Sequence, residues 1–488
     1  MKKTKILLPL VGLSALVSAM IPLVGCSCGN QDDPDPTEKV TITFEASEGG
    51  SLVGETSIEV DKGIKWSEVT KPTPSPSENY DFNCWFNGEN VMLDNEEINS
   101  NITVTASFVS HYLCITDNVE PAGKGSKVKI TNVEKNDLQL QYSEDGENWD
   151  TWDESGEEGK DETVTLDIKD GKKLYIRNTK NVWCHKTTQD EIPSIIIQDE
   201  EGKTSDFVST TDVSGNILSL INWNEENVEN IIFPMLFTGA VANDGINIKN
   251  AENLILPFKT LQPMEYAYMF YGCTGLETAP ALPAETLAED CYANMFQGCS
   301  SLGTAPKLLA TELATGCCYE MFRDCTSLKI APELNATTLA EGCYDGMFRG
   351  CESLTQAPAL NASTLVQACY QNMFRGCSSL TQAPTLNAST LAESCYNSMF
   401  TYCTKLTTAP ALPAAILVTN CYYNMFASCT SLTVNEKDTE NPGDADHLIF
   451  QAPTDTSILT AQNMFLNTGG TRSSGDTPIA SRWYYWAE

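Results

Sequence analysis

The sequence predicts a multidomain protein in which two N-terminal all-β modules are followed by a right-handed α/β solenoid with 26-residue coils. The dipeptide Met-Phe carries the solenoid prediction, because it recurs with an unbroken step of 26 residues. It stands at Met269-Phe270, Met295-Phe296, Met321-Phe322, Met347-Phe348, Met373-Phe374, Met399-Phe400 and Met425-Phe426. A fixed period of 20–50 residues is typical of stacked repeats that bury a continuous core. Alternating apolar and polar residues before the repeats predict the β modules.

The N-terminus carries a signal for membrane anchoring. Three lysines among the first five residues are followed by an apolar run over residues 6–24, which leads into the sequence LVGC. This sequence resembles a bacterial lipobox, and the resemblance implies removal of residues 1–25 and attachment of lipid to Cys26. An uncleaved membrane helix is the alternative, because the run is long enough to span a bilayer. Residues 26–38 are expected to form a short acidic tether.

Two β modules are expected next. Residues 39–110 alternate apolar and polar residues, as in VTITFEAS and ITVTASF, which predicts half-buried strands. The run NYDFNCWFNGENV resembles the aromatic–glycine segment of internalin-type B-repeats, with Cys84 where those repeats carry glycine. This resemblance implies a β-grasp-like module that acts as a stalk. Residues 111–223 contain further strand-like runs at short spacing, from KVKITNV to SIIIQDE, and these predict a β-sandwich.

Each 26-residue unit has the same internal order. A Cys follows the Phe by three residues, a Leu follows it by six, an Ala-Pro pair comes next, and a second Cys precedes the next Met by four. We expect a brief extended segment, because proline lacks the donor that a sheet needs. A short helix is expected after it, because Leu391, Cys395 and Met399 fall at i, i+4 and i+8. The preceding sequence NAST offers side chains that cap a helix.

The repeats, typified by MFRGCSSLTQAPTLNASTLAESCYNSMF, resemble leucine-rich repeats of the BspA type, which are common on bacterial surface lipoproteins. Regular units cover residues 265–432. Residues 224–264 and 433–488 are expected to be an N-terminal cap repeat and a C-terminal cap, because a finite stack needs atypical ends. The resemblance implies display on the outer membrane or on a single cell membrane. It also implies adhesion to, or recognition of, an extracellular protein or glycan.

The repeat cysteines leave alternatives open. The chain has 19 cysteines, and 14 of them lie in the repeats. They are either buried free thiols stacked one per coil, or disulfides that join the extended segment to the helix, which an extracellular compartment permits. The candidate pairs are Cys273–Cys291, Cys299–Cys317, Cys325–Cys343, Cys351–Cys369, Cys377–Cys395 and Cys403–Cys421, with Cys114–Cys184 as a further pair in the second module. Metal binding is the least favoured interpretation, because zinc sites use tighter Cys spacing.

The face that displays the extended segments is the expected binding surface. Its variable positions are mostly small and neutral, with few aromatic or Arg anchors, so we expect broad, weak and multivalent contact. The candidate residues are Glu277, Thr278, Thr304, Lys307, Lys329, Glu333, Thr355, Gln356, Thr381, Gln382, Thr385, Thr407 and Thr408.

Charge and motifs narrow the class of function. Acidic residues number 65 against 30 basic ones, a net charge of −35. Such a surface argues against binding to nucleic acid or anionic headgroups, which need Lys and Arg to replace counterions. The sequence has no P-loop, dinucleotide fingerprint, HExxH or GxSxG motif. We therefore expect a monomeric, lipid-anchored binding protein without cofactor or metal, not an enzyme. The rival hypotheses are a structural or antigenic surface-coat protein and, more distantly, an extracellular hydrolase.

Overall fold

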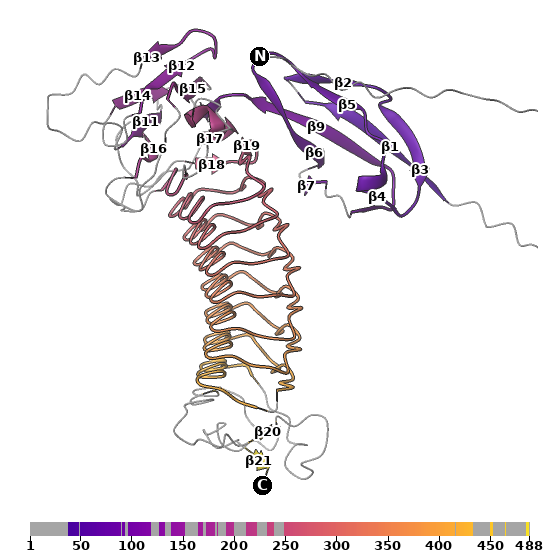
Figure 1. Ribbon diagram of the computed structural model, residues 1–488, viewed down its shortest axis with the longest axis vertical. Helices are drawn as coiled ribbons and strands as arrows, with labels where there is room; N and C mark the ends of the chain where they lie inside the picture. The colour runs from indigo at the N-terminus through magenta and orange to yellow at the C-terminus, as the bar shows by residue number, and fades with distance from the viewer. Residues whose placement is uncertain are drawn as a thin grey trace, which may run out of the picture.

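The computed structural model describes residues 38–47, 49–88, 90–92, 96–118, 126–131, 138–151, 164–168, 172–180, 183, 192–199, 211–221, 232–238, 248–414, 416–432, 449–451, 464 and 485–487. The predicted leader, Cys26, Cys184 and most of the predicted C-terminal cap lie outside these residues. Within the described part of the chain, no helix is long and apolar enough to cross a membrane. Figure 1 shows two β modules at the N-terminal end of a long stack of coils.

The first module is a five-stranded sheet with the order β3-β1-β9-β6-β7, in which β1 and β9 run parallel. Its strands are β1 (Lys39–Ala46), β3 (Ser57–Asp61), β6 (Tyr80–Asn87), β7 (Asn90–Val91) and β9 (Ile102–Ser110). Two short pairs complete it: β2 (Gly50–Val53) with β5 (Thr73–Pro76), and β4 (Ile64–Lys65) with β8 (Glu97–Ile98). The alternation in β1 buries Val40, Ile42 and Phe44 on one face, where they meet Trp66 and Trp85 in a separate core.

The β-grasp-like prediction is wrong in one respect. The only helical segment that the structure describes in this module is the three-residue turn η1 (Trp66–Glu68), so the sheet carries no long helix.

The second module contains two sheets around one core. The larger has the order β13-β12-β15-β10-β17-β18, and β19 also pairs with β17. Its first five strands are β13 (Asp150–Thr151), β12 (Leu140–Ser143), β15 (Lys173–Asn178), β10 (Leu113–Asp117) and β17 (Thr211–Asn216). The smaller sheet is β14 (Val164–Ile168), β11 (Ser126–Ile130) and β16 (Ile195–Asp199). Ile115 and Ile176 from the larger sheet share a core with Val128 and Ile197 from the smaller one.

The larger sheet continues directly into the coils. Strand β17 pairs in parallel with β18 (Ile248–Asn250) and β19 (Leu254–Ile255), which belong to the first coil, and η4 (Ile217–Ile221) lies buried at the junction. Gly215 allows β17 to lie close to the backbone of Tyr112, because its φ is +84° and a Cβ at this position would collide with Tyr112 O. One hydrophobic core therefore runs from the second module to the last coil.

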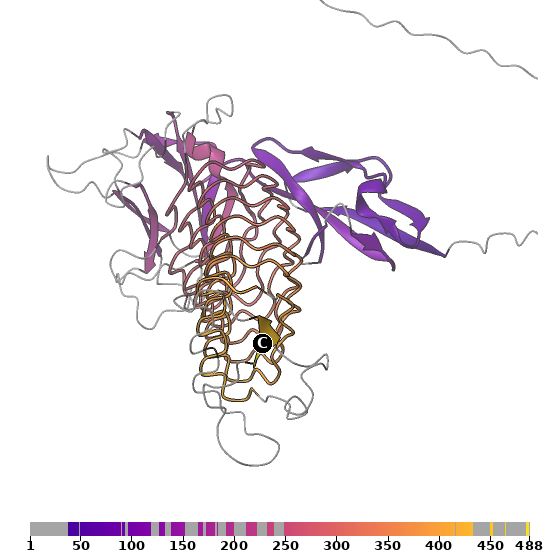
Figure 2. The ribbon, with the colours of Figure 1, turned by 60° about the horizontal axis from the view of Figure 1, so that its bottom comes forward.

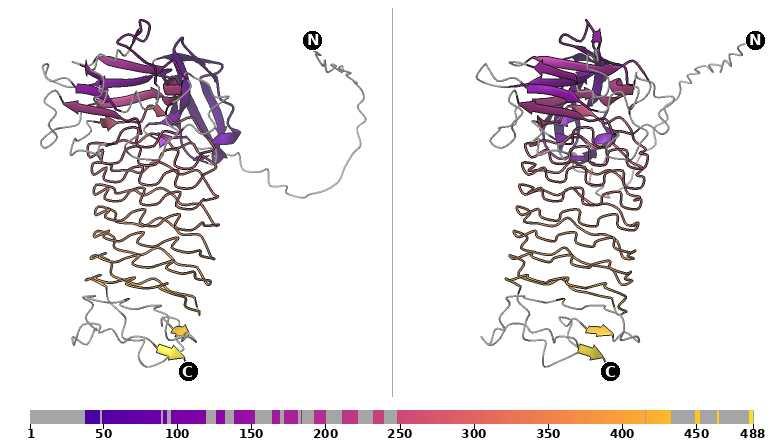
Figure 3. Two further views of the ribbon diagram at one scale, coloured as in Figure 1. Left: turned by 60° about the vertical axis from the view of Figure 1, so that its left-hand side comes forward. Right: turned by 90° about the vertical axis from the view of Figure 1, so that its left-hand side faces the viewer.

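Residues 248–432, termed the coil stack, form coils that step by 26 residues (Figure 3). In a view partly along the stack the coils lie over one another (Figure 2). Backbone amides alternate between two partners. Met295 N–H donates to Tyr292 O at 3.2 Å, which closes a turn, whereas Phe296 N–H donates to Met321 O in the next coil at 2.9 Å. Each coil therefore satisfies half of these amides by itself and half through its neighbour.

Left-handed residues shape the turns. Asp290, Asn294 and Gly298 have φ values of 52°, 57° and 78°, and a left-handed residue recurs at every fourth position in the corresponding segments of the other coils. Gly, Asn and Asp are the residues that adopt this conformation at the lowest cost. The chain therefore zigzags through consecutive turns where a helix was expected.

The prediction of a helix-containing α/β solenoid is wrong. The described repeats contain turns instead of helices, and isolated parallel bridges such as Thr304↔Ile330 instead of a continuous sheet. The physical reason is that residues four positions apart lie on the same side both in a helix and in a series of four-residue turns. Leu391, Cys395 and Met399 lie at the same phase of successive turns and are all buried, so the apolar pattern is satisfied without a helix.

Stacked side chains fill the core of the coils. Phe rings of neighbouring coils lie 5.3–5.8 Å apart, centroid to centroid, in one column from Phe237 to Phe426. A second column stacks Tyr344 to Tyr422 at 5.9–6.0 Å. At the far end, Phe426 N–H donates to Met464 O at 2.9 Å, so Met464 continues the pattern of bonds beyond the last regular coil.

Candidate functional site

All thirteen residues of the predicted binding face are exposed. They occupy three columns of the extended segments. The first holds Glu277, Lys329, Thr355, Thr381 and Thr407; the second holds Thr278, Thr304, Gln356, Gln382 and Thr408; the third holds Lys307, Glu333 and Thr385. Parallel bridges such as Gln356↔Gln382 hold neighbouring coils of this face in register.

Part of the chemistry of this face is already engaged in the fold. The hydroxyls of Thr381 and Thr407 donate to carbonyl oxygens one coil earlier, at 3.4 Å each. Lys307 Nζ lies 3.9 Å from Glu96 Oε2 of the first module. None of the thirteen residues is aromatic or Arg, the types that usually dominate binding energy. The face is accessible but offers few strong anchors.

The predicted disulfides are not formed, because the sixteen described cysteines are free thiols. This corrects Cys273–Cys291, Cys299–Cys317, Cys325–Cys343, Cys351–Cys369, Cys377–Cys395 and Cys403–Cys421. The thiols after each Phe bond along the stack instead. Cys325 Sγ donates to Phe296 O at 3.0 Å, and Cys351 Sγ donates to Phe322 O at 3.1 Å. The alternative of a buried thiol ladder describes this arrangement.

Burial also lowers the reactivity of most repeat thiols; Cys317 is the exception, because its contact with Cys318 lowers its pKa. Burial raises the pKa of Cys369 and Cys429 to about 12 and that of Cys421 to about 11, so each is protonated at neutral pH. The thiolate is the nucleophile and the metal ligand. Within the described part of the chain, no three His, Cys, Asp or Glu side chains are grouped to hold a metal ion.

A second exposed face follows the turns. The two residues before each Met and the two after each Phe are together termed the turn ridge. Some of them, such as Tyr319 and Tyr402, are exposed, whereas others, such as Asn294, Glu320 and Thr401, are buried. In this ridge, the residues that directly follow each Phe form one column: Tyr271, Gln297, Arg323, Arg349, Arg375, Thr401 and Ala427. Three of the six basic residues of the repeat region therefore stand on consecutive coils of one column.

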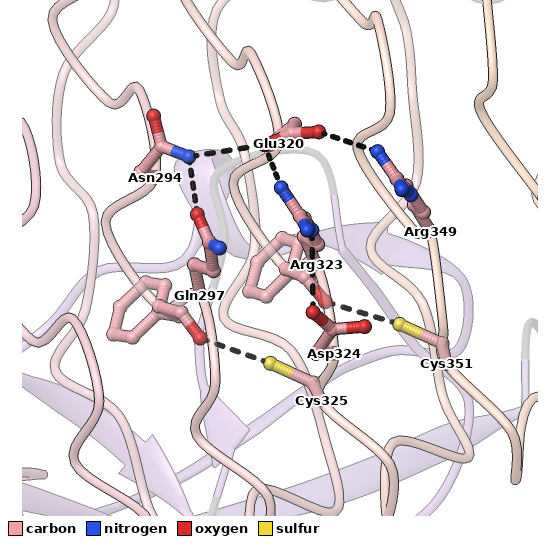
Figure 4. A network of polar contacts seen from close by, with 10 residues as sticks. Asn294, Gln297, Glu320, Arg323, Asp324, Cys325, Arg349 and Cys351 are labelled. Carbon is pink, nitrogen blue, oxygen red and sulfur yellow. Dashed lines mark hydrogen bonds and ion pairs between the residues drawn. The ribbon is translucent and has the colours of Figure 1, made fainter.

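Glu320 is the centre of a polar network on the turn ridge (Figure 4). Its side chain is 9% exposed. Oε2 lies 2.8 Å from Arg323 Nη1, and Oε1 lies 3.3 Å from Arg349 Nη1 of the next coil. Asn294 Nδ2 of the preceding coil also donates to Glu320, at 3.5 Å, and Arg323 Nε reaches Asp324 at 3.2 Å. One carboxylate thus ties three coils together and fixes two guanidinium groups.

A second carboxylate lies one coil further along. Asp345 accepts hydrogen bonds from Gln371 Nε2 at 2.9 Å and from Asn372 Nδ2 at 3.2 Å. Burial is the largest influence on its pKa and raises it to about 6. The group changes charge near neutral pH, on the same side of the coils as the arginines.

Arg375 and Tyr402 differ from the network just described. Among the described residues Arg375 forms no ion pair, and its guanidinium carbon lies 5.9 Å from the centroid of the Tyr402 ring. Tyr402 is 52% exposed. An unneutralised guanidinium and an accessible aromatic ring are groups that a ligand can engage directly.

Sequence reasoning missed the turn ridge because it expected a short helix in this part of each repeat. The signal was present. Gly, Asn, Asp or Ser occurs at most of the positions that recur every four residues around Met-Phe, for example Asp290, Asn294 and Gly298. Such a pattern favours consecutive turns over a helix.

Comparison with known proteins adds no assignment. The chain matches no protein-family model, no curated protein sequence and no solved structure. The resemblance to BspA-type repeats therefore stays a prediction.

Proposed function

We propose that this chain is a surface-displayed recognition protein, anchored by lipid at Cys26, whose coil stack binds an extracellular protein or glycan. The turn ridge is the single observation that supports this most directly. It presents Arg, Tyr, amide and carboxylate side chains on an outer face of the repeats. These are side chains that hydrogen-bond and stack rather than side chains that only keep a surface soluble.

The turn ridge is a stronger candidate than the extended face. Arg323, Arg349 and Arg375 supply planar guanidinium groups, and Tyr319 and Tyr402 are 38% and 52% exposed. Arg and Tyr are enriched among residues that carry binding energy, whereas Thr is under-represented. The extended face consists mainly of Thr and Gln with two Lys and two Glu, so it is the second choice.

The backbone supports binding by holding the turn ridge rigid. Arg375 N–H donates to Asn372 O within the coil at 2.9 Å, and Gly376 N–H donates to Thr401 O of the next coil at 2.8 Å. Side chains mounted on a fixed backbone lose less conformational entropy on binding. Recognition by a preformed surface follows from this arrangement.

The test is binding of the purified full chain to an array of extracellular-matrix proteins and glycans. Two charge-matched variants are compared with it: Arg375→Glu on the turn ridge and Lys329→Glu on the extended face. We expect saturable binding that Arg375→Glu weakens and Lys329→Glu does not. The reverse pattern would move the site to the extended face. No binding by the folded chain to any member of the array would favour a structural or surface-coat protein.

A further inference from the structure

The arginine column of the turn ridge is neutralised at one end and open at the other. Glu320 and Asp324 accept contacts from Arg323, and Glu320 also pairs with Arg349. The equivalent positions around Arg375 are Asn372 and Gly376 in its own coil, and Gly346 and Gly350 in the coil before. None of these four residues carries a negative charge. Arg375 therefore presents the positive charge of the column that the fold leaves uncompensated.

Tyr402 supplies a second, independent observation. It occupies the position that is Gly in most coils, with a φ of 65°. A bulky side chain in the left-handed region is an outlier, and such strain occurs preferentially at ligand-binding sites. The ring gains little from burial, because it is 52% exposed. Packing of the ring therefore does not offset the backbone strain, which points to a role for the exposed ring itself.

Glycines form the floor between these two groups. A Cβ at Gly376 would meet only the backbone of Gly350, at 3.6 Å, so no side chain lies within 4 Å of that position. The space above Gly350 is different, because a Cβ there would collide with the Asp324 carboxylate. The open area therefore lies at Gly376, between Arg375 and Tyr402, whereas Asp324 covers the glycine one coil earlier.

We propose that Arg375, Tyr402 and the floor at Gly376 form a subsite for a carboxylate-bearing sugar residue of a glycan. This inference rests on the proposed function and names its ligand class. A guanidinium group binds a carboxylate through two parallel hydrogen bonds. The exposed face of Tyr402 suits the flat, weakly polar face of a sugar ring, and the absence of a side chain at Gly376 allows the ring to approach the backbone.

The net charge of the chain opposes an anionic ligand only at a distance. The charge of −35 is spread over 488 residues, and at physiological salt charges separated by more than about 8 Å are largely screened. The groups close to Arg375 therefore decide whether an anionic ligand binds there. An isolated carboxylate is attracted to this point of the turn ridge, whereas the arginines at 323 and 349 already have partners.

An acidic peptide fits the same surface less well. A peptide strand gains affinity by pairing its backbone with free amide and carbonyl groups. The amides of Asn372, Gly376 and Tyr402 all donate to the next coil, at 2.8–2.9 Å, so they offer no such donors. The apolar side chains of the neighbouring Met and Phe are fully buried and are not available as contacts for an anchor residue of a peptide. Because only side chains are available for recognition, an acidic sugar fits this surface better than an acidic peptide.

The experiment measures binding of the full chain to oligogalacturonate, to its methyl ester, to sialyllactose and to oligoglutamate by isothermal calorimetry. Variants Arg375→Gln and Tyr402→Ser remove the two anchors, and Ser is the residue that position 428 of the same column carries. Lys405→Gln is the control, because it removes one positive charge from an exposed residue outside the turn ridge. Thermal unfolding verifies that each variant is folded.

We expect saturable binding of at least one acidic sugar, weakened at least about tenfold by esterification, by Arg375→Gln and by Tyr402→Ser, but not by Lys405→Gln. Equal binding of acid and ester, equal loss in the Lys405 variant, or no binding of either acidic sugar would overturn the inference. Tighter binding of oligoglutamate would replace it with an acidic peptide. If the acidic sugars fail while binding to the protein and glycan array persists, the proposed function survives without this subsite.

Discussion

The thiol of Cys325 donates a hydrogen bond to the carbonyl oxygen of Phe296, one coil earlier, at 3.0 Å. The same oxygen accepts the backbone amide of Cys299 at 3.1 Å, so both of its lone pairs are used. The contact recurs from Cys273 to Cys429. It explains why this column holds Cys, which is small, tolerates full burial and still supplies a weak donor.

Free thiols are the first testable consequence. After denaturation in the presence of an alkylating agent, peptide mapping without reductant should recover the cysteines of residues 273–429 as alkylated, unlinked residues. Native protein should react little with the same agent, because burial excludes the reagent and raises the pKa of thiols such as Cys273 and Cys377. Recovery of a peptide that links Cys273 to Cys291 would contradict the ladder and restore the disulfide hypothesis.

Two glycine substitutions test the zigzag of turns. Gly376 has a φ of +80° and its nearest neighbours would lie 3.6 Å from an added Cβ, so Gly376→Ala introduces strain without a clash. We expect a loss of about 1–2 kcal/mol in the free energy of unfolding of the coil stack. Gly303→Ala is the control, because its φ is not left-handed and a Cβ there would meet nothing within 4 Å. If both variants lower the unfolding temperature by the same amount, the left-handed conformation of Gly376 is contradicted.

The Phe column predicts the cost of a gap in the core. Phe348 is fully buried and its ring lies 5.8 Å from Phe322 and 5.7 Å from Phe374. Phe348→Ala should destabilise the stack by about 3–5 kcal/mol, since it removes a buried ring and leaves a cavity. Phe348→Leu should cost clearly less. Denaturant titration measures both, and equal effects would mean that the stacked rings do not carry the stability.

Glu265 should make stability depend on pH. It occupies the column that holds Cys in the following coils, it is 1% exposed, and its Oε1 has no partner within the described structure. Burial raises its pKa from 4.5 to about 8. The unfolded chain ionises near pH 4.5, so the stability contributed by the protonated group is complete below that pH and is lost as the pH rises towards 8.

The variant Glu265→Cys installs the residue of the other coils and removes this titration. It should unfold at a higher temperature than the parent protein at pH 8, and the advantage should shrink towards pH 4.5. Differential scanning calorimetry at both pH values makes the comparison. An advantage that is equal at the two values would show that Glu265 is not the titrating group.

The sequence was informative where a property depends on which residues are buried. The 26-residue step, the buried Met, Phe, Cys and Leu columns and the exposed candidate face are all visible in the pattern, and the structure shows them at those positions. The strand over Lys39–Ala46 follows from alternation in the same way. Burial patterns record which residues face inward and say less about how the backbone brings them there.

The backbone path and the polar site were not predictable from that pattern alone. A spacing of four residues fits a helical face and a chain of turns equally well, and only the left-handed residues between Leu391 and Met399 distinguish them. The expected helix gave no reason to connect Glu320 with Arg323 and Arg349, which form one network across two coils. Contacts between residues about 26 positions apart depend on the stacking geometry.

The alternation of amides between a coil and its neighbour has a genetic consequence. Every coil offers the next one the same set of backbone bonds, as Phe296 does with Met321 and Phe322 does with Met347. Recombination that deletes or duplicates one repeat would leave the same backbone hydrogen bonds at every remaining junction. The gene can therefore lengthen, shorten or reshuffle the outer faces without redesigning the interior, and related strains should differ in copy number before they differ in the buried columns.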